Sequence, residues 1–290
     1  CWRLRRRVRA ACETGLRPRK GFIDRARIRP VPHACLARRA RVSSVFLTEP
    51  LTTPYETAVD VGCGSGQSSE AIAPYFKNVV AFDTNENQLE NAQRRTNYFN
   101  IIYRKGSAER IDCLDSSVTL VTAGQSSHWF DLPKFLAEVE RVLVPGGVLS
   151  IYGHYLPKLS HPTYSIEYLI EKFLVCGKLT EYMPEESKKI YMDRYTHGYE
   201  KFPFSEEPVI RDESYSVELP TTVADVVSYI STFSSITAYR EKHGDRATAA
   251  LLQNFENELL DSVRSNKKPE ETNLSILFRY ILLMGRKPFY

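Results

Sequence analysis

The sequence contains no long uninterrupted apolar run. A membrane-spanning helix needs about 20 consecutive, predominantly apolar residues, and the longest candidate, Leu274 to Met284, is interrupted by Arg279. With 42% hydrophobic and 26% charged residues over 290 positions, the composition is typical of a folded globular chain. We therefore expect no membrane partner.

Paired cysteine motifs are also missing. The six cysteines form no Cys-x-x-Cys pair, and no group of histidines has the spacing of metal ligands. Such spacings are typical of zinc sites and dithiol redox centres. We therefore expect no metal site, free thiols, and a reducing, cytoplasmic location.

Acidic residues are scarce at the start of the chain. Residues 1–42 contain 14 Lys and Arg but only two acids, Glu13 and Asp24, whereas the rest has 25 basic and 33 acidic residues. A basic arm is typical of nucleic-acid binding or organelle targeting. Because the chain begins with Cys1 and this region has no helical period, we expect an incomplete start, and we give the charge little functional weight. Residues 1–54 are predicted to be an irregular basic leader.

From Tyr55 onward, short β-prone runs alternate with helical stretches. That alternation is typical of βαβ units and a parallel sheet. Strands are expected at 58–61, 79–82, 101–103, 118–123 and 148–152, with helices at 68–75, 86–97 and around 135–143. Pro145-Gly146-Gly147 is expected to end the last helix in a tight turn. The pattern predicts a core domain over residues 55–154.

The rhythm changes beyond that domain. Residues 155–210 are aromatic, charged and irregular, with few strand signals. A strand is expected at 215–219, helices near 222–230, 235–242 and 245–263, and a closing strand at 274–284. We predict that residues 155–290 form a helical lid together with the last strands of the same sheet.

The strongest local signal is the run from Val59 to Gly66, in which glycines at 62, 64 and 66 separate a strand from a helix. Glycine is needed where a chain turns sharply and a ligand lies against bare backbone. A dinucleotide site would place its third glycine at Gln67, and no Walker lysine follows. The alternative, a turn without a ligand, is disfavoured in this strand–turn–helix context.

Two acidic positions follow later strands. Asp83 lies 21 residues after Gly62, at the end of the second expected strand, and a carboxylate there can accept both hydroxyls of an adenosine ribose. The alternative is a solvated Asp that caps the next helix. After the third strand, Ser107-Ala108-Glu109 offers a small residue and an acid for the edge of an adenine, although the tripeptide alone is a weak signal.

Taken together, these motifs resemble those of the class I S-adenosylmethionine-dependent methyltransferases, in particular the type 11 and trans-aconitate methyltransferase-like group. The likeness covers about residues 56–288 and is most specific in the first third. The motifs that carry it are Asp60–Gly66, Val80–Asp83, Gly106–Glu109, His128-Trp129-Phe130, Arg141–Gly147, Thr232-Phe233-Ser234 and Leu283–Pro288.

The resemblance implies an α/β, Rossmann-like fold, with a mostly parallel seven-stranded sheet flanked by helices and a helical lid. It also implies an enzyme whose cofactor is S-adenosyl-L-methionine. The glycine loop would hold the methionine end, Asp83 the ribose, the position of Ala108 the adenine, and the loop at Gly124–Gln125 would pass beside the methionine. The residues we therefore expect at the cofactor are Asp60, Gly62, Gly64, Gly66, Asp83, Ala108, Glu109 and Gln125.

Two departures from the family stand out. Thr119 occupies a position in the fourth strand where the family often has Asp. The helix that usually precedes the first strand and helps close the site is not recognisable in residues 1–54. Its loss would weaken cofactor binding.

His128 has two interpretations. It is a candidate catalytic base, because an ordinary histidine pKa suits physiological pH. Alternatively, it packs between the fourth strand and the next helix, the position that we favour for Trp129.

The sequence lacks the motifs of several acceptor classes. No Asn/Asp-Pro-Pro-Tyr or Pro-Cys follows the fourth strand, which disfavours amino-group methylation of bases and covalent attack on pyrimidine carbon. By resemblance we expect a small-molecule acceptor. The preferred hypothesis is an organic acid methylated on oxygen, with Arg194, Tyr195 and Arg240 as candidates to bind its carboxylate. We expect no nucleic-acid partner, and a monomer or homodimer.

Two alternatives stay open. One is an RNA or protein methyltransferase anchored by the basic leader. The other is a catalytically silent cofactor-binding or interaction protein.

Overall fold

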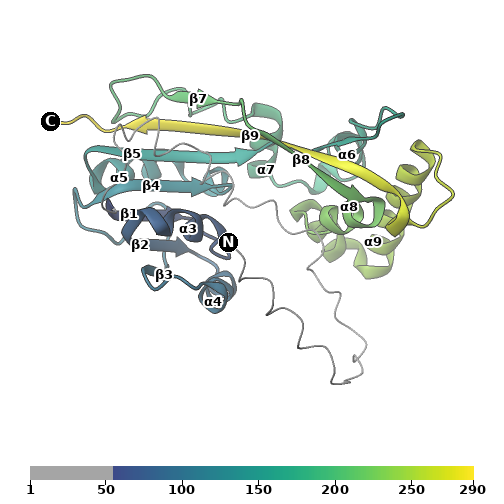
Figure 1. Cartoon of the computed structure of the whole chain (residues 1–290), viewed down its shortest axis with the longest axis horizontal. Coiled ribbons are helices and arrows are strands. Elements are labelled where there is room, and N and C mark those ends of the chain that lie inside the picture. The colour runs from purple at the N-terminus through teal and green to yellow at the C-terminus, as the bar shows by residue number, and fades with distance from the viewer. Residues whose placement is uncertain (1–54) are drawn as a thin grey trace, which may run out of the picture.

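The computed structural model describes residues 55–290, except for the side chains of 189–192. The predictions about the basic leader and about a closing helix before the first strand lie outside the described residues. Within them, the chain forms one long mixed sheet with helices on both faces of its first half and a helical cluster at its other end (Figure 1).

Five parallel strands form the first half of the sheet, in the order β3-β2-β1-β4-β5. They are β1 (Tyr55–Val61), β2 (Phe76–Asp83), β3 (Ile101–Lys105), β4 (Val118–Gly124) and β5 (Leu143–His154). The last four residues of β1 are all buried, because a central strand is covered on both faces. This burial explains why the strand signals in the sequence are continuous apolar runs.

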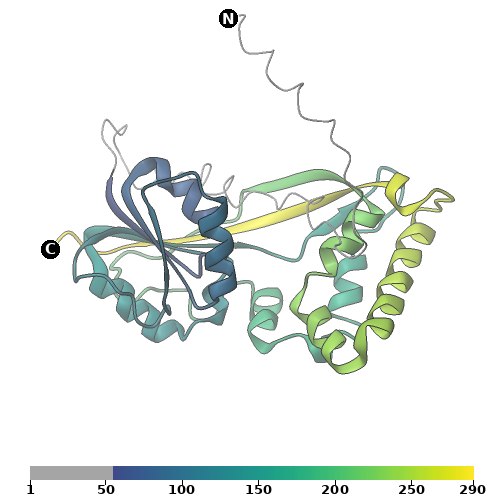
Figure 2. The same cartoon turned by 90° about the horizontal axis from the view of Figure 1, so that it is seen from below.

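Helices cover both faces of these five strands (Figure 2). They are α3 (Gln67–Ile72), continued by the 3₁₀ turn η1 (Ala73–Tyr75), α4 (Glu86–Arg95) and α5 (Leu132–Val142). Side-chain caps start two of them, because Asn85 accepts a hydrogen bond from Gln88 N and Asp131 accepts one from Lys134 N. The apolar residues of α5 that lie at helical spacing are buried, namely Phe135, Leu136, Val139 and Val142.

One long strand, β9 (Asn273–Arg286), connects the two halves of the molecule (Figure 1). Its residues 280–286 run antiparallel to β5, and β7 (Ile210–Asp212) pairs on the same stretch. Its residues 273–279 pair with β6 (Lys158–Ser160) and β8 (Ser216–Thr222). The strands β3-β2-β1-β4-β5-β9-β7 therefore form the mostly parallel seven-stranded sheet that was predicted, and β6 and β8 extend it.

Three helices lie around the far end of β9, namely α6 (Leu169–Leu174), α8 (Val223–Ile230) and α9 (Ser234–Ser262), with the short 3₁₀ turns η3 (Thr180–Tyr182) and η4 (Pro269–Glu271) between elements. A fourth helix, α7 (Glu185–Asp193), lies between this cluster and the first half of the sheet (Figure 2). α9 is broken at Gly244, where φ is 80° and ψ is 170°, so the two separate helical segments expected there are confirmed. The stacked rings of Phe173 and Phe255, 4.1 Å apart, pack α6 against α9.

Two features differ from the sequence expectations. α6, α7 and β6 lie in the stretch 155–210 that was expected to be irregular, and β7 begins at its last residue. β5 begins at Leu143 and includes the expected turn at 145–147, where its pairing with β4 shifts register. The turn is thus an irregularity within a strand, and Gly146 supplies its positive φ of 77°.

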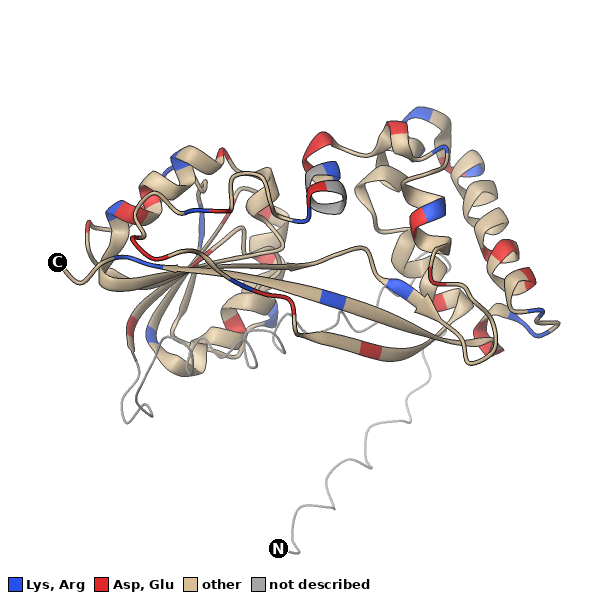
Figure 3. Cartoon of the chain, turned by 90° about the horizontal axis from the view of Figure 1, so that it is seen from above, with Lys and Arg blue, Asp and Glu red and all other residues tan. Residues whose placement is uncertain are grey.

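Charged side chains lie mostly on the outer helices and connecting loops, whereas the strands carry few (Figure 3). This distribution is expected for helices that bury one face against a sheet. Among residues 55–290, no helix combines the length and apolar character needed to cross a membrane.

Candidate functional site

The turn after β1 is built from three left-handed glycines. Gly62, Gly64 and Gly66 have φ angles of 67°, 54° and 87°, a conformation that glycine adopts without strain. A Cβ added to Gly62 would lie 2.5 Å from Ser126 Cβ, and one on Gly66 would lie 2.4 Å from Tyr103 Oη. A Cβ on Gly64 would meet nothing within 4 Å. Gly64 therefore leaves an open stretch of bare backbone against which a ligand can lie.

Asp83, at the end of β2, contacts this turn directly. Its Oδ2 accepts a hydrogen bond from Gly64 N at 2.8 Å, and its Oδ1 accepts one from Asn85 N at 2.8 Å. A carboxylate has about four lone-pair sites, so each oxygen retains capacity for a ribose hydroxyl. The structure thus places the predicted glycine loop and the predicted acid side by side. Their roles in cofactor binding stay a prediction.

Asp60 lies beneath the glycine turn. Its side chain is fully buried. Oδ1 accepts hydrogen bonds from Ser68 Oγ at 3.1 Å and Thr122 Oγ1 at 2.9 Å, and Oδ2 accepts one from Ser69 Oγ at 2.6 Å. Ser68 Oγ also makes a hydrogen bond to Tyr152 Oη. The carboxylate therefore ties β1, β4 and the start of α3 together.

The predicted role of Asp60 at the cofactor stays a prediction. In the structure its carboxylate has no exposed surface and accepts from three hydroxyls, so it supports the turn from below. Burial raises the pKa of Asp60 to about 6, and the hydrogen bonds from the three hydroxyls only partly oppose that increase.

The loop after β3 lies next to Asp83, because Gly106 N donates to Asp83 O at 3.1 Å. Ala108 is buried. Glu109 accepts hydrogen bonds from Ser107 Oγ at 2.6 Å and Asp131 N at 2.9 Å. Burial alone would raise the pKa of Glu109, but these hydrogen bonds outweigh it and lower that pKa, so the carboxylate is ionised at neutral pH. The predicted adenine side is thus fixed both to Asp83 and to the start of α5.

Gln125 joins the carboxyl ends of β4 and β5. It is a left-handed non-glycine residue with a φ of 54°. Its side-chain amide pairs with the backbone of His154, donating from Nε2 to the carbonyl at 3.3 Å and accepting at Oε1 from the N–H at 2.9 Å. The next residue, Ser126, donates to Val61 O at 2.9 Å and so holds this loop onto the glycine turn. Sequence reasoning missed Ser126, whose contact is 65 residues away along the chain.

His128 lies in the 3₁₀ turn η2 (Ser127–Trp129). Its Nδ1 is buried and has no hydrogen-bond partner within the described part of the chain. Burial lowers the pKa of His128 to about 4, so the imidazole is neutral at physiological pH. In the fold, the pKa of His128 is therefore below the ordinary histidine value on which its candidacy as a base rested.

The expected packing of Trp129 is wrong, because the residue is 53% exposed. Of the proposed carboxylate grips, Arg240 approaches Asp245 at 3.6 Å, and the guanidinium of Arg194 lies over the ring of Tyr155 at 5.6 Å. Tyr195 is buried, and its hydroxyl donates to Gln125 Oε1 at 3.5 Å.

The segment after α7 thus covers the loop after β4. Besides the contact of Tyr195 with Gln125, Tyr199 Oη lies 3.1 Å from Ser127 Oγ. Neither Tyr199 nor its partner was predicted, because nothing in the sequence pattern links positions 72 residues apart. We name residues 193–199 the acceptor-side segment, since they lie over the loop that carries His128, the candidate catalytic residue.

Arg211 of β7 holds this segment in place. It donates to Arg194 O at 2.7 Å and to Tyr195 O at 3.0 Å. Both of these residues are left-handed, with φ angles of 51° and 57°, which is costly for residues with a side chain. The Arg211 guanidinium stabilises two strained backbone positions at once, and no sequence signal indicated it.

Comparison with known proteins identifies the core. Residues 59–151 match a family described as a methyltransferase domain. A solved structure from Anaeromyxobacter dehalogenans, described as a type II methyltransferase, is 27% identical and superposes with a TM-score of 0.61 over 80% of this chain and 91% of its own. The core is a class I methyltransferase domain. Enzymes of this class use S-adenosyl-L-methionine as the methyl donor, as predicted.

The likeness of the methyltransferase domain extends into the lid in some relatives. A protein of Dictyostelium discoideum named as a methyltransferase is 32% identical over 184 residues, which cover 63% of this chain and 66% of that protein. A second solved methyltransferase structure, from Bacillus halodurans, shares the fold at 18% identity, with a TM-score of 0.52 over 88% of this chain and 99% of its own. The match to a relative from Schizosaccharomyces pombe spans only 38% of that protein's length.

Proposed function

We propose that the chain transfers a methyl group from S-adenosylmethionine to a carboxylate oxygen of a small organic acid. The observation that carries the cofactor half is the contact between Gly64 and Asp83, beside backbone left open at Gly64. These residues fit an adenosine-bearing ligand, because the acid retains acceptor capacity for the ribose and no side chain lies within 4 Å of a Cβ built on Gly64. When bound, the cofactor supplies an electrophilic methyl group on a positively charged sulfonium.

The residues of the site would act by placement. The backbone of the glycine turn would bind the cofactor, and Asp83 would accept hydrogen bonds from its ribose hydroxyls. The loop after β4 would orient the acceptor from the opposite side. Holding two reactants in line and excluding water accounts for a large part of such a rate enhancement. The acceptor-side segment, which covers Gln125 and Ser127, would exclude the water.

The pKa of His128 favours a carboxylate acceptor. A base with a pKa of about 4 is too weak to deprotonate an alcohol or a thiol effectively at neutral pH. A carboxylate needs no base, since it is already ionised. A neutral imidazole also avoids placing a second positive charge beside the sulfonium. His128 therefore orients the acceptor in this proposal and does not remove a proton.

One distant relative is consistent with this chemistry. A malonyl-[acyl-carrier protein] O-methyltransferase of Pectobacterium atrosepticum is 32% identical over 93 residues, which cover 32% of this chain and 36% of that protein. Its printed name describes methylation on oxygen. The match covers only about a third of each chain, so it supports the reaction type more than the identity of the acid.

The proposal is tested with methyl-labelled S-adenosylmethionine and a panel of dicarboxylic and tricarboxylic acids, each beside its amide. We expect label in acids only, and release of that label as volatile methanol in mild alkali, because esters hydrolyse and N- or S-methyl groups do not. Label that stays bound after alkali, or that appears in RNA or protein added to the same assay, would contradict the proposal. A D83A variant, which loses the ribose acceptor, provides the inactive control.

A further inference from the structure

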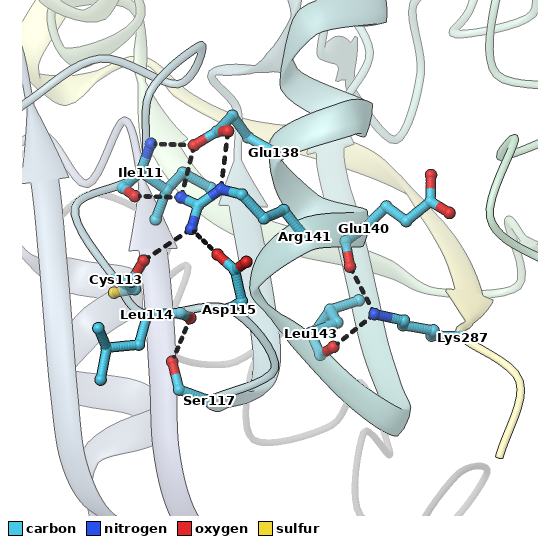
Figure 4. Close-up of polar contacts among 10 residues, drawn as sticks. All are labelled: Ile111, Cys113, Leu114, Asp115, Ser117, Glu138, Glu140, Arg141, Leu143 and Lys287. Atoms are coloured by element: carbon cyan, nitrogen blue, oxygen red, sulfur yellow. Dashed lines mark hydrogen bonds and ion pairs between the residues drawn. The ribbon is translucent and has the colours of Figure 1, made fainter. Parts of the chain in front are cut away.

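The guanidinium of Arg141, on α5, contacts the loop after β3 at several points (Figure 4). Nη2 donates to Ile111 O at 2.7 Å, and Nη1 donates to Cys113 O at 2.9 Å and to Asp115 Oδ1 at 2.7 Å. Nε and Nη2 also form a forked pair with the two carboxylate oxygens of Glu138, at 2.9 and 2.8 Å. All of its hydrogen-bonding nitrogens are therefore engaged.

Glu138 completes the connection. Its Oε2 accepts from Ile111 N at 2.8 Å, so the N–H and the C=O of Ile111 are both held by this pair of side chains. The hydrogen bonds from Arg141 are the main reason that the pKa of Glu138 is lowered. The side chains are only 33% and 20% exposed, which makes this pair more than a solvated surface ion pair.

The helix that carries the pair is itself fixed. One face of α5 is fully packed against the sheet. Lys287 Nζ donates to Glu140 O at 2.7 Å and to Leu143 O at 2.9 Å, which satisfies carbonyls at the end of the helix (Figure 4). Because α5 is fixed in place, Arg141 holds the loop in a fixed position.

That loop carries the residues next to the proposed ribose site. Ile111 lies three residues after Ala108 and two after Glu109. The loop begins at Gly106, whose N–H donates to Asp83 O. The base of a nucleoside whose ribose is held by Asp83 would extend toward this loop. The distance between Asp83 and the backbone of Ala108 and Glu109 is thus fixed at one end by Gly106 and at the other by Arg141.

We propose that Arg141 is a positioning residue that, through the backbone of Ile111 and Cys113, gives the site its selectivity for adenine over other purines. This inference rests on the proposed function, since it assumes that an adenosine binds at Asp83. Arg141 contacts the loop and not the ligand. It acts by holding Ala108 and Glu109 at hydrogen-bonding distance from the 6-amino edge of the base.

The test compares S-adenosylhomocysteine with S-inosylhomocysteine, in which the 6-amino donor is replaced by a 6-oxo acceptor. Binding of each is measured by calorimetry to the full chain and to R141Q, R141K and E138Q. R94A is the matched control, because Arg94 also pairs with a carboxylate on its own helix but is exposed.

We expect the native chain and R94A to prefer S-adenosylhomocysteine by about tenfold or more, the size of one well-placed hydrogen bond. R141Q should lose about tenfold in affinity for S-adenosylhomocysteine but less than about threefold for S-inosylhomocysteine, so that the preference collapses. R141K and E138Q should fall between these limits, because each keeps part of the network without the fork.

Equal losses for both ligands would overturn the inference, because a general structural role lowers both affinities alike. So would an unchanged preference in R141Q and E138Q, or no preference in the native chain. Failure of the native chain to bind either ligand is a different result. It would overturn the proposed function, and this inference with it. Unfolding curves of each variant, recorded alongside, show whether it is folded under the conditions of the assay.

Discussion

Two arginines hold the two sides of the site, and they do so with nearly the same contacts. Arg141 binds two loop carbonyls and the carboxylates of Glu138 and Asp115. Arg211 binds two loop carbonyls, Tyr155 Oη at 3.1 Å and the carboxylate of Glu213 at 2.6 Å. Their side chains are 33% and 34% exposed.

What differs is the support behind each arginine. Arg141 stands on an 11-residue helix packed against the sheet, whereas Arg211 stands on the three-residue strand β7, all of whose residues are exposed. The backbone that Arg211 holds is left-handed at two consecutive positions, Arg194 and Tyr195. The cofactor side is therefore built on regular, buried elements. The acceptor side is built on a strained segment whose two left-handed carbonyls are bound by one partly exposed side chain.

The largest expected difference between the two sides is in how the free energy of unfolding depends on pH, and it comes from a buried carboxyl group. Asp60 is fully buried under the cofactor side with a pKa of about 6, about two units above the value of about 3.9 for an exposed Asp. Because the folded state holds this proton more tightly than the unfolded state, stability falls as pH rises from about 4 to above 6. In D60N that dependence disappears.

We therefore expect the free energy of unfolding of D60N to rise relative to the native chain by about 3 kcal/mol between pH 4 and pH 8. Urea unfolding at several pH values measures it. The H128Q variant is the companion on the acceptor side and should show the opposite sign. Because burial lowers the pKa of His128 to about 4, the unfolded state binds this proton more tightly, and the free energy of unfolding of H128Q should fall relative to the native chain by about 3 kcal/mol between pH 4 and pH 8. If the free energy of unfolding depended on pH in the same way in D60N and in the native chain, burial would not raise the pKa of Asp60.

Loss of Arg141 should be the next largest effect. In R141A, two loop carbonyls and the partly buried Glu138 lose their donors, and we expect the free energy of unfolding to fall by about 2 kcal/mol. R94A should lose less than about 0.5 kcal/mol, because exposed i,i+4 pairs contribute little. Denaturant unfolding compares them directly, and similar losses in the two variants would show that the Arg141 network contributes no more than a surface pair.

Loss of Arg211 should act locally. We expect R211A to lower the free energy of unfolding by only about 1 kcal/mol, but to open the acceptor-side segment about tenfold more often, because nothing then offsets its left-handed backbone. Chymotrypsin cleavage after Tyr195 and Tyr199 reports that opening, and R141A is the control. Equal cleavage in the two variants would remove the distinction between a rigid and a restrained side.

The smallest effect should come from one hydroxyl. Tyr199 Oη lies 3.1 Å from Ser127 Oγ, and removing it in Y199F should cost about 0.5 kcal/mol, the lower end of the net value of a typical hydrogen bond. Y168F, at a half-exposed tyrosine, is the control and should be neutral. Thermal unfolding of the two variants makes the comparison, and identical midpoints would mean that the acceptor-side segment is held by Arg211 and packing alone.

The comparison also explains what the sequence could and could not predict. On the cofactor side the buried strands are continuous apolar runs, and α4 and α5, with 10 and 11 residues, are long enough to show a hydrophobic period. The glycines of the turn and Asp83 were found from their spacing. α6, β6 and β7 have three to six residues, too few for any period. The Gly244 break was visible because residues on both sides of it are strongly helical.

Roles that depend on contacts between residues far apart in the sequence could not be predicted. That Asp60 faces inward follows from Thr122, 62 residues away, and the grip of Arg141 involves carbonyls 28 and 30 residues away. Arg141 was noticed as part of a motif, but the motif shows only that an arginine is there. Arg211 was not noticed, because a charged residue on an exposed strand has no distinctive pattern.

The 14 residues of β9 are a shared neighbour for four other strands, and this has a consequence for synthesis. While the chain emerges from the ribosome, β5 through β8 must wait without their partner until residues 273–286 appear. Such long-range pairing is slow and leaves strand edges exposed in the meantime. The edges of β6, β7 and β8 that pair with β9 therefore stay open until the last strand is made.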